Sequence, residues 1–215
     1  MKNGQGGFTL VEIAIVLVII GLLLGGVLKG QELINSAKVK NLANDFRSIP
    51  TMVFAYQDKF RALPGDDRAA SAHVAGVPLA IDGNGDGRID GAWNAQPAGG
   101  ACPTESCNFW QHVRLANLAS GPTDPGSGAD YFPRNSEGGF IGIAGVSPVA
   151  GWAGNFFVCS TNIQGRFVRQ LDITSDDGNT GTGSIRVIAR VDGSAFPANL
   201  TPTEDSHLFT VCSSN

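Results

Sequence analysis

Gly7-Phe8-Thr9-Leu10-Val11-Glu12 is the stretch that decides the fold, because an apolar segment follows it without a break to Leu28. The seven residues before Phe8 carry one charged side chain, Lys2. As a helix with a rise of about 1.5 Å per residue, residues 8–28 are long enough to cross the roughly 30 Å hydrocarbon core of a bilayer. The segment therefore predicts a transmembrane helix.

Glu12 is the one carboxylate inside this apolar segment. Hydrocarbon excludes an ionised carboxylate unless a partner neutralises it. A secretory signal peptide is cut after its apolar region, whereas the Gly7-Phe8 junction comes before the apolar region. Cleavage at this junction leaves the helix on the mature protein, so residues 1–7 are predicted to be a leader peptide.

These features resemble the N-terminus of the type IV pilin and pseudopilin family. The resemblance is strongest over residues 1–64 and extends to Leu63-Pro64-Gly65-Asp66. It implies that a prepilin peptidase cuts after Gly7 and methylates Phe8, and that the helix waits in the inner membrane for an assembly machine. It further implies that identical or related subunits polymerise through this helix into an extracellular or periplasmic filament. In that filament, Glu12 would pair with the new amino terminus of a neighbouring subunit.

The filament's type stays open at this point. Many major pilins carry a proline where this chain has Lys29, so a pilus subunit, which we prefer, and a type II secretion pseudopilin remain alternatives. A third alternative is a membrane-anchored exported binding protein or enzyme that never polymerises. Glu12 favours the filament, because a simple anchor has no use for a carboxylate near its start. No catalytic motif is present in the sequence, and we expect no enzyme.

Composition limits the partners and the compartment. The formal net charge of −4 over 215 residues provides no field that would attract nucleic acid. Four cysteines allow three pairings, and the sequence does not choose among them. The short loop between Cys102 and Cys107 favours a local bridge, which leaves Cys159 with Cys212. The anchor helix favours an oxidising, exported compartment over four reduced thiols.

The rest of the chain predicts a domain of α+β class, with the long helix packed on a small antiparallel sheet. Residues 29–62 form the amphipathic second half of that helix, and residues 63–215 form the globular domain. Pro50 is expected to kink the helix. The stripe that faces the domain consists of Leu42, Phe46, Ile49, Val53, Tyr56 and Phe60.

Within the domain, apolar spacing predicts helices at residues 106–118 and 164–173. Aromatic and β-branched runs predict strands, and residues 66–107 and 121–139 read as irregular or turn-rich. The predicted strands are residues 139–143, 155–159, 184–191 and 207–212.

Residues 82–93 are predicted to bind calcium. Their first nine residues match the first nine positions of a twelve-residue calcium loop, with glycine at position six. The twelfth position should be a bidentate Glu but is Trp93, and Glu105 is the nearest acid that could replace it. The alternative is a turn without metal. The candidate ligands are Asp82, Asn84, Asp86, the carbonyl of Arg88, Asp90 and Glu105.

A second group of oxygens occurs at Asp176, Asp177 and Asn179. Here an ordinary turn is the favoured interpretation, because Asp-Asp-Gly-Asn is a common turn sequence. The three histidines are isolated in the sequence, and each is expected to be a structural or surface residue.

Overall fold

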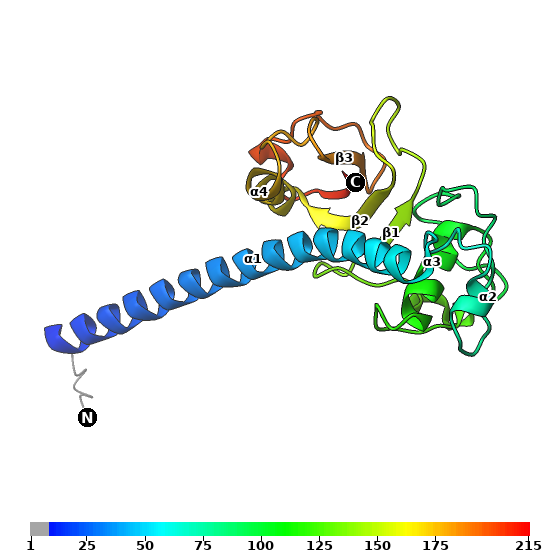
Figure 1. Ribbon diagram of the computed structural model, residues 1–215. Helices are drawn as coiled ribbons and strands as arrows, with labels where there is room; N and C mark the ends of the chain where they lie inside the picture. The colour runs from blue at the N-terminus through cyan, green and yellow to red at the C-terminus, as the bar shows by residue number, and fades with distance from the viewer. Residues whose placement is uncertain (1–8) are drawn as a thin grey trace. The chain divides into compact units, whose positions relative to one another are not determined.

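The computed structural model describes residues 9–215, and its contacts divide the chain into two units, Met1–Lys38 and Val39–Asn215. Helix α1, Leu10–Phe60, runs through both units as 51 helical residues (Figure 1). It agrees with the single long helix predicted from the sequence. Pro50 lies inside α1 without interrupting it.

The first unit is described by the helix residues that precede Val39. Its apolar side chains are exposed from Leu10 to Leu28, and several are more than 60 % accessible. By length and composition, α1 contains a segment apolar enough to cross a membrane. An apolar helix that buries none of these side chains against residues 9–215 needs another apolar environment, either lipid or other copies of the helix.

In the second unit, the remainder of α1 packs against the domain through one stripe. The buried side chains recur at intervals of three or four residues, as expected for one helix face. Of the six predicted stripe residues, five are buried and Phe60 is half-buried. The complete buried set is Val39, Leu42, Ala43, Phe46, Ile49, Val53 and Tyr56.

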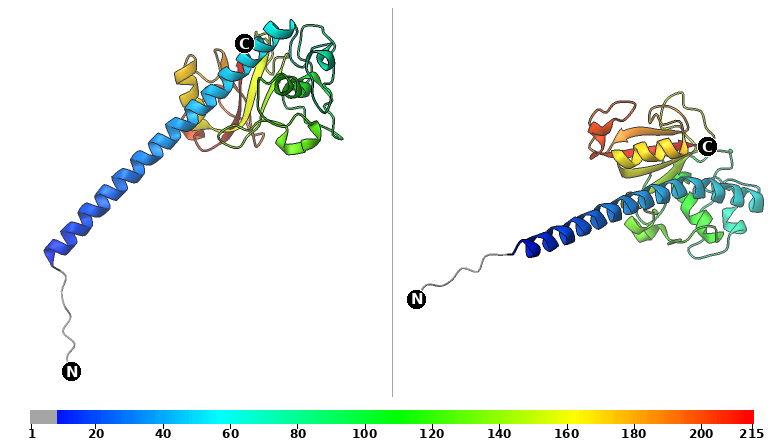
Figure 2. Two further views of the ribbon diagram at one scale, coloured as in Figure 1. Left: turned by 60° about the horizontal axis from the view of Figure 1, so that its bottom comes forward. Right: turned by 90° about the vertical axis from the view of Figure 1, so that its left-hand side faces the viewer.

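The sheet has four antiparallel strands in the order β1-β2-β4-β3 (Figures 1 and 2). Their bounds are Ile141–Ala144 for β1, Phe157–Gln164 for β2, Ile185–Arg190 for β3 and Leu208–Ser214 for β4. The four strands were predicted, and so was the α+β class. β2 is longer than predicted because it continues past a bulge at Thr161 and Asn162, where Asn162 adopts φ 60°. Its buried Ser160 accepts a hydrogen bond from Asn135, which compensates for burying this polar group.

The two faces of the sheet have different cores. One face supplies alternate residues such as Val158 and Val211 to the main core shared with α1 and α3. The opposite face carries Phe157, Cys159 and Cys212, which form a second buried cluster with Trp152. This alternation is the two-residue period of a strand covered on both sides.

Both disulfide bridges of the favoured pairing are present. Cys102 and Cys107 close a short loop at the start of α3, and Cys159 joins Cys212 directly across β2 and β4. The second bridge spans 53 residues of sequence. It therefore links the middle of the domain to its last strand.

The segment between α1 and the sheet contains α2, Ala70–His73, α3, Glu105–Leu115, and the 3-10 turn η1, Pro125–Asp130. α3 ends earlier than predicted because Asn117 adopts the left-handed conformation with φ 62°. The buried His112 of α3 organises this segment. Its Nδ1 accepts from the Gly65 amide at 2.9 Å, and its Nε2 donates to the Ile81 carbonyl at 2.8 Å.

After β2 the chain forms α4, Gly165–Ser175, in agreement with the predicted helix at residues 164–173. Its buried side chains include Phe167, Val168 and Leu171, which join the main core. A short 3-10 turn, η2, Pro202–Glu204, precedes the last strand. Figure 2 shows α4 and the long helix together with the sheet from two further directions.

Candidate functional site

The first candidate site is the start of α1. Thr9 is the residue before the helix, and Glu12 is its third residue. The Glu12 carboxylate accepts hydrogen bonds from the Thr9 amide and hydroxyl, both at 2.8 Å, while the Glu12 amide donates to the Thr9 hydroxyl at 3.2 Å. This is a capping box, which satisfies amides that the first turn of a helix leaves unpaired. The predicted processing residues, Gly7 and Phe8, lie outside the described residues.

The capping box is a role for Glu12 that the sequence interpretation missed. Its signal was present, because Thr-x-x-Glu before an apolar run is the pattern of a capping box. Glu12 was predicted instead to pair with an amino terminus. The two roles use the same carboxylate, and a carboxylate has enough lone pairs to serve both.

The second candidate site is the loop predicted to bind calcium. Asn84 Oδ1 accepts from the Asp86 amide at 2.8 Å, and Asp86 Oδ1 accepts from the Arg88 amide at 3.0 Å. Asn84 also donates to Asp90 at 3.3 Å. Gly85 and Gly87 have φ of 74° and 89°, a conformation that side chains with a Cβ rarely adopt. The loop therefore turns tightly, and the side chains of Asn84 and Asp86 form hydrogen bonds within it.

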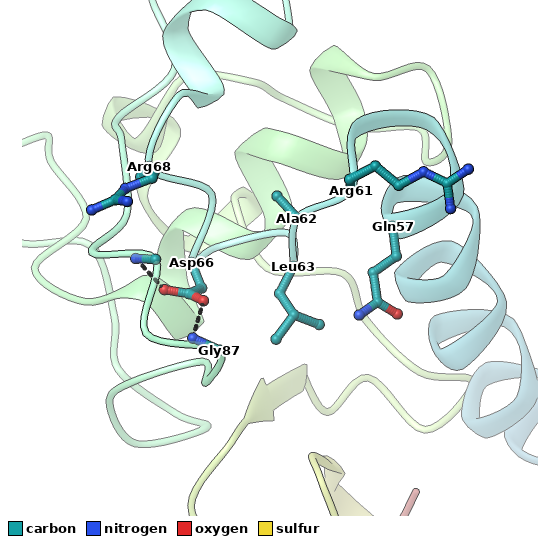
Figure 3. Close-up of a pocket in the computed structure, with 8 residues that line it drawn as sticks. Gln57, Arg61, Ala62, Leu63, Asp66, Arg68 and Gly87 are labelled. Carbon is teal, nitrogen blue, oxygen red and sulfur yellow. Dashed lines mark hydrogen bonds between the residues drawn. The ribbon is translucent and has the colours of Figure 1, made fainter.

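Asp66 also stabilises this loop through hydrogen bonds, which was not predicted from the sequence. Its carboxylate accepts from three consecutive amides, those of Gly85 at 2.6 Å, Asp86 at 3.0 Å and Gly87 at 2.8 Å. Figure 3 shows the bond from Gly87. Asp66 is only 3 % exposed. It comes from the Leu63-Pro64-Gly65-Asp66 turn that ends the long helix, so the turn and the loop form one structure.

Glu105 holds the loop from the other side. Its carboxylate accepts from the amides of Asn84 at 2.8 Å and Asp90 at 2.9 Å. Burial raises the pKa of this carboxyl, and the nearby charges of Asp66 and Asp90 add to the effect, while the two amide hydrogen bonds oppose it. The structure thus places Glu105 against the loop, where the sequence interpretation expected it to replace the missing twelfth ligand.

Two other predicted positions have different surroundings. Both carboxylate oxygens of Asp82 accept from Ser71, one from its amide at 2.7 Å and one from its hydroxyl at 3.1 Å. Trp93 stacks on Phe140 with ring centroids 5.4 Å apart, so it is a packing residue. Within residues 9–215, the acidic, histidine and cysteine side chains that group closely enough to hold a metal are Asp172, Asp176 and Asp177, and Asp82, Asp86 and Asp90 form no such group.

The donor set of the loop nevertheless fits a hard cation. Carboxylate, amide and main-chain carbonyl oxygens are the ligands that calcium takes, and it accepts six to eight of them in flexible geometry. Asn84, Asp86 and Asp90 lie along the loop, and Glu105 is a buried carboxylate whose charged form is disfavoured by its surroundings. A bound cation would stabilise that charged form.

The comparison with protein families supports the N-terminal site. Residues 2–28 match the prokaryotic N-terminal methylation motif, which is the prepilin signal of type IV pilins and pseudopilins. The matched residues include Gly7, Phe8 and Glu12. No curated protein and no solved structure matches the chain. The motif and the one long apolar helix together indicate anchoring in a membrane.

Proposed function

Because residues 2–28 carry the prepilin signal of type IV pilins and pseudopilins, we propose that the chain is a structural subunit of a type IV pilus-like filament. A prepilin peptidase removes the leader after Gly7 and methylates Phe8. The mature subunit waits in the inner membrane, anchored by the apolar half of α1. It then joins a filament whose core is made of these helices.

The observation that carries the proposal is the combination of this signal with the exposed apolar surface that follows it. The side chains of Leu10, Leu17 and Leu22 are each more than 60 % accessible, and the domain has a separate core of its own. In a bilayer lipid covers this surface, and in a filament other copies of the helix cover it. One surface therefore serves both the anchored and the assembled subunit.

Glu12 provides the reason to prefer a polymer over a simple anchor. An unpaired carboxylate in hydrocarbon costs several kcal/mol. Cleavage after Gly7 creates a cationic amine on Phe8, and an incoming subunit can present this amine to the Glu12 of a subunit already in the filament. Pairing neutralises both charges and fixes the axial offset between neighbours.

A secretion-system pseudopilin is the second candidate, since the same motif marks both classes. α1 continues without a break through Lys29 and Gly30, where many major pilins have a proline, and Lys29 pairs with Glu32 at 2.7 Å. Both candidates share processing and polymerisation, so the tests below apply to both.

Processing is tested by expressing the chain with and without a prepilin peptidase and measuring the intact mass. We expect a product that begins at Phe8 and carries one added methyl group. Gly7→Val should block the cleavage, because a larger residue does not fit beside Phe8, whereas Gly6→Ala should be cut normally. A membrane-bound product that keeps Met1 in the presence of the peptidase would reject the proposal.

We further propose that the loop binds calcium through Asn84, Asp86, the Arg88 carbonyl, Asp90 and Glu105, with Asp66 holding the loop in shape. A cation that binds only the folded domain raises its stability with concentration. Full-length protein in detergent should melt at a higher temperature in calcium than in chelator. Asp86→Ala should lose a distinct part of this increase, and an increase of the same size in Asp86→Ala would reject the site.

A further inference from the structure

Asp172, in the last turn of α4, is a buried carboxylate. Its side chain is 0 % exposed. Within the described part of the chain, neither of its carboxylate oxygens makes a hydrogen bond of normal geometry, although the Gly178 amide lies close enough to lower the pKa of the group. A buried charge is costly unless it is paired or coordinates a metal, so this group requires an explanation.

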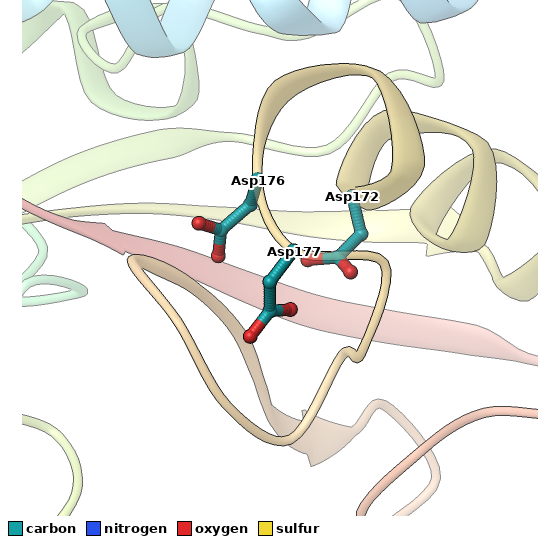
Figure 4. Close-up of side chains that lie close together, drawn as sticks. All are labelled: Asp172, Asp176 and Asp177. Atoms are coloured by element: carbon teal, nitrogen blue, oxygen red, sulfur yellow. The ribbon is translucent and has the colours of Figure 1, made fainter.

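Two further carboxylates lie beside it. Ligand oxygens of Asp172, Asp176 and Asp177 all lie within 4.8 Å of one another. Figure 4 shows the three side chains gathered where α4 ends and the next loop begins. Three carboxylates at this separation repel one another unless a cation lies between them.

The loop holds Asp176 and Asp177 in place. Asp176 accepts from the Ser184 hydroxyl at 3.0 Å and from the Ile185 amide at 2.8 Å. Asp177 accepts from the Asn179 amide at 2.8 Å and from the Thr182 hydroxyl at 2.7 Å. Each oxygen keeps a free lone pair, because a carboxylate oxygen offers two. The loop thus holds the carboxylates of Asp176 and Asp177 next to the buried carboxylate of Asp172.

A glycine leaves room for this arrangement. Gly183 has φ 70°, and a Cβ added to it would overlap the carboxylate of Asp176. The close approach of Asp176 to the strand therefore requires the absence of a side chain at this position. The backbone of the loop therefore helps to determine where the Asp176 carboxylate lies.

The surroundings favour a cation. The C-terminal end of a helix carries a partial negative charge, and the last turn of α4 has no basic residue. The hydrogen bonds from Thr182 and Asn179 lower the pKa of Asp177, and the charge of Arg186 adds to this effect. The Arg186 guanidinium also has other contacts, because its Nε donates to the Gly183 carbonyl and the group lies over the ring of Trp152. Burial, followed by the charges of Asp176 and Asp177, raises the pKa of Asp172 to about 6, and the Gly178 amide only partly opposes this.

We propose that Asp172, Asp176 and Asp177 bind a divalent cation, and that the cation is calcium. All three ligands are hard carboxylate oxygens, and no histidine or cysteine belongs to the group, which disfavours zinc and other transition metals. Calcium accepts irregular sets of carboxylates completed by water, whereas magnesium requires near-octahedral geometry. The site is separate from the loop at residues 82–90 and depends on different residues.

The test is the number of calcium ions bound per chain. Full-length protein in detergent is stripped with chelator and titrated with calcium by isothermal titration calorimetry. Asp172→Asn should lose one ion relative to the wild type, and Asp177→Asn, at an exposed position, should lose the same ion. Asp192→Asn is the matched control, because Asp192 is an exposed carboxylate paired with Arg190. It should bind as many ions as the wild type.

The same variants in an Asp86→Ala background separate this site from the loop. If both sites bind, the count falls from two to one with either change and to zero with both. If the loop binds nothing, Asp172→Asn alone takes the count from one to zero. Calcium binding in Asp172→Asn and Asp177→Asn that equals that of the control would overturn the inference.

A melting experiment gives an independent readout. In chelator, Asp172→Asn should melt no lower than the wild type, because it removes a charge that burial disfavours. In calcium, the wild type should gain more stability than Asp172→Asn gains. Equal gains in the two proteins would also overturn the inference.

Discussion

Thr9 and Glu12 bond to each other three times at the start of α1, through the Thr9 amide, the Thr9 hydroxyl and the Glu12 amide. Glu12 therefore has a partner within its own helix before it meets any other subunit. The capping box uses the acceptor capacity of the side chain, whereas pairing with the amine of another subunit uses its charge. Substitutions at these two residues can separate the two roles.

Replacing Glu12 with Ala should leave membrane insertion and folding of the domain intact and reduce assembly. We expect the yield of sheared filaments, relative to membrane-bound subunit, to fall by about tenfold or more, as the loss of at least 1.4 kcal/mol per contact implies. The measurement is quantitative immunoblotting of both fractions. Filament yield equal to that of the wild type would remove Glu12 from the assembly mechanism.

Glu12→Gln and Thr9→Val distinguish charge from capping. Gln keeps an oxygen that can accept the Thr9 hydrogen bonds but has no charge, so Glu12→Gln should assemble as poorly as Glu12→Ala. Thr9→Val removes the hydroxyl but keeps the charge, and it should assemble nearly as well as the wild type. The reverse pattern would mean that capping, rather than charge pairing, is what assembly requires.

Asp66→Asn should destabilise the domain by about 2 kcal/mol, the scale for losing hydrogen bonds to a buried charged group. An amide in place of the carboxylate presents an N–H donor to one of the loop amides, which is also a donor. The measurement is chemical denaturation of the full-length protein in chelator. Asp58→Asn, at an exposed position with 87 % side-chain accessibility, is the control and should change stability by less than about 0.5 kcal/mol.

His112 should make the domain less stable at low pH. Burial lowers its pKa in the folded state below the usual 6.5, and the hydrogen bond to Ile81 and the charges of Asp67 and Asp82 only partly oppose this. Below pH 6.5 the unfolded chain takes up a proton that the folded domain refuses, so stability is lost as the pH falls from about 6.5 toward the lowered pKa. At higher pH this contribution is fully present.

The check is the melting temperature of wild type and His112→Gln between pH 7.5 and 5. His112→Gln should be less stable at pH 7.5, because it removes a buried ring that stacks on Tyr56. The difference in melting temperature between the two proteins should narrow as the pH falls. Taking this difference cancels the contributions of titrating groups that both proteins share. A difference that stays constant with pH would assign no titration to His112 in this range.

The two disulfide bridges should contribute unequally. In the chain-entropy model, a bridge over 53 residues is worth about 4 kcal/mol and one over 5 residues about 2 kcal/mol. Cys159→Ala with Cys212→Ala should therefore reduce the free energy of unfolding more than Cys102→Ala with Cys107→Ala. Equal losses, measured by urea denaturation, would show that local packing outweighs loop closure.

Local patterns in the sequence predicted most of the fold. The stripe from Leu42 to Tyr56 follows the period of a helix, and Ile185 and Val187 alternate as in a strand, because each element repeats the geometry of its neighbours. The errors occur at ends and irregularities. α3 stops before Leu118 because Asn117 adopts a left-handed conformation, and β2 continues through polar residues because Asn135 satisfies Ser160.

The candidate sites depend on contacts between distant residues, which local patterns do not encode. Asp66 reaches amides about 20 positions further along the chain, and nothing in its surroundings in the sequence marks this. Asp172 reads as a polar residue of a helix, and only the fold brings it to Asp176 and Asp177 as a buried carboxylate. The favoured interpretation of Asp176 and Asp177 as an ordinary turn did not include Asp172. By contrast, the sequence singled out Glu105 as the nearest acid after a loop that lacked a ligand, and its carboxylate does contact that loop. Its role as a calcium ligand stays a prediction.

The central claim is that this chain is a processed filament subunit, and mass spectrometry of sheared filaments tests it most directly. Filaments sheared from cells that express the chain, or from cells with its assembly machinery overexpressed, are purified and digested. The account predicts abundant peptides of this chain, with an N-terminal peptide that begins at methylated Phe8 and contains Glu12. A chain found only in the membrane fraction, or one in filaments that still begins at Met1, would contradict it.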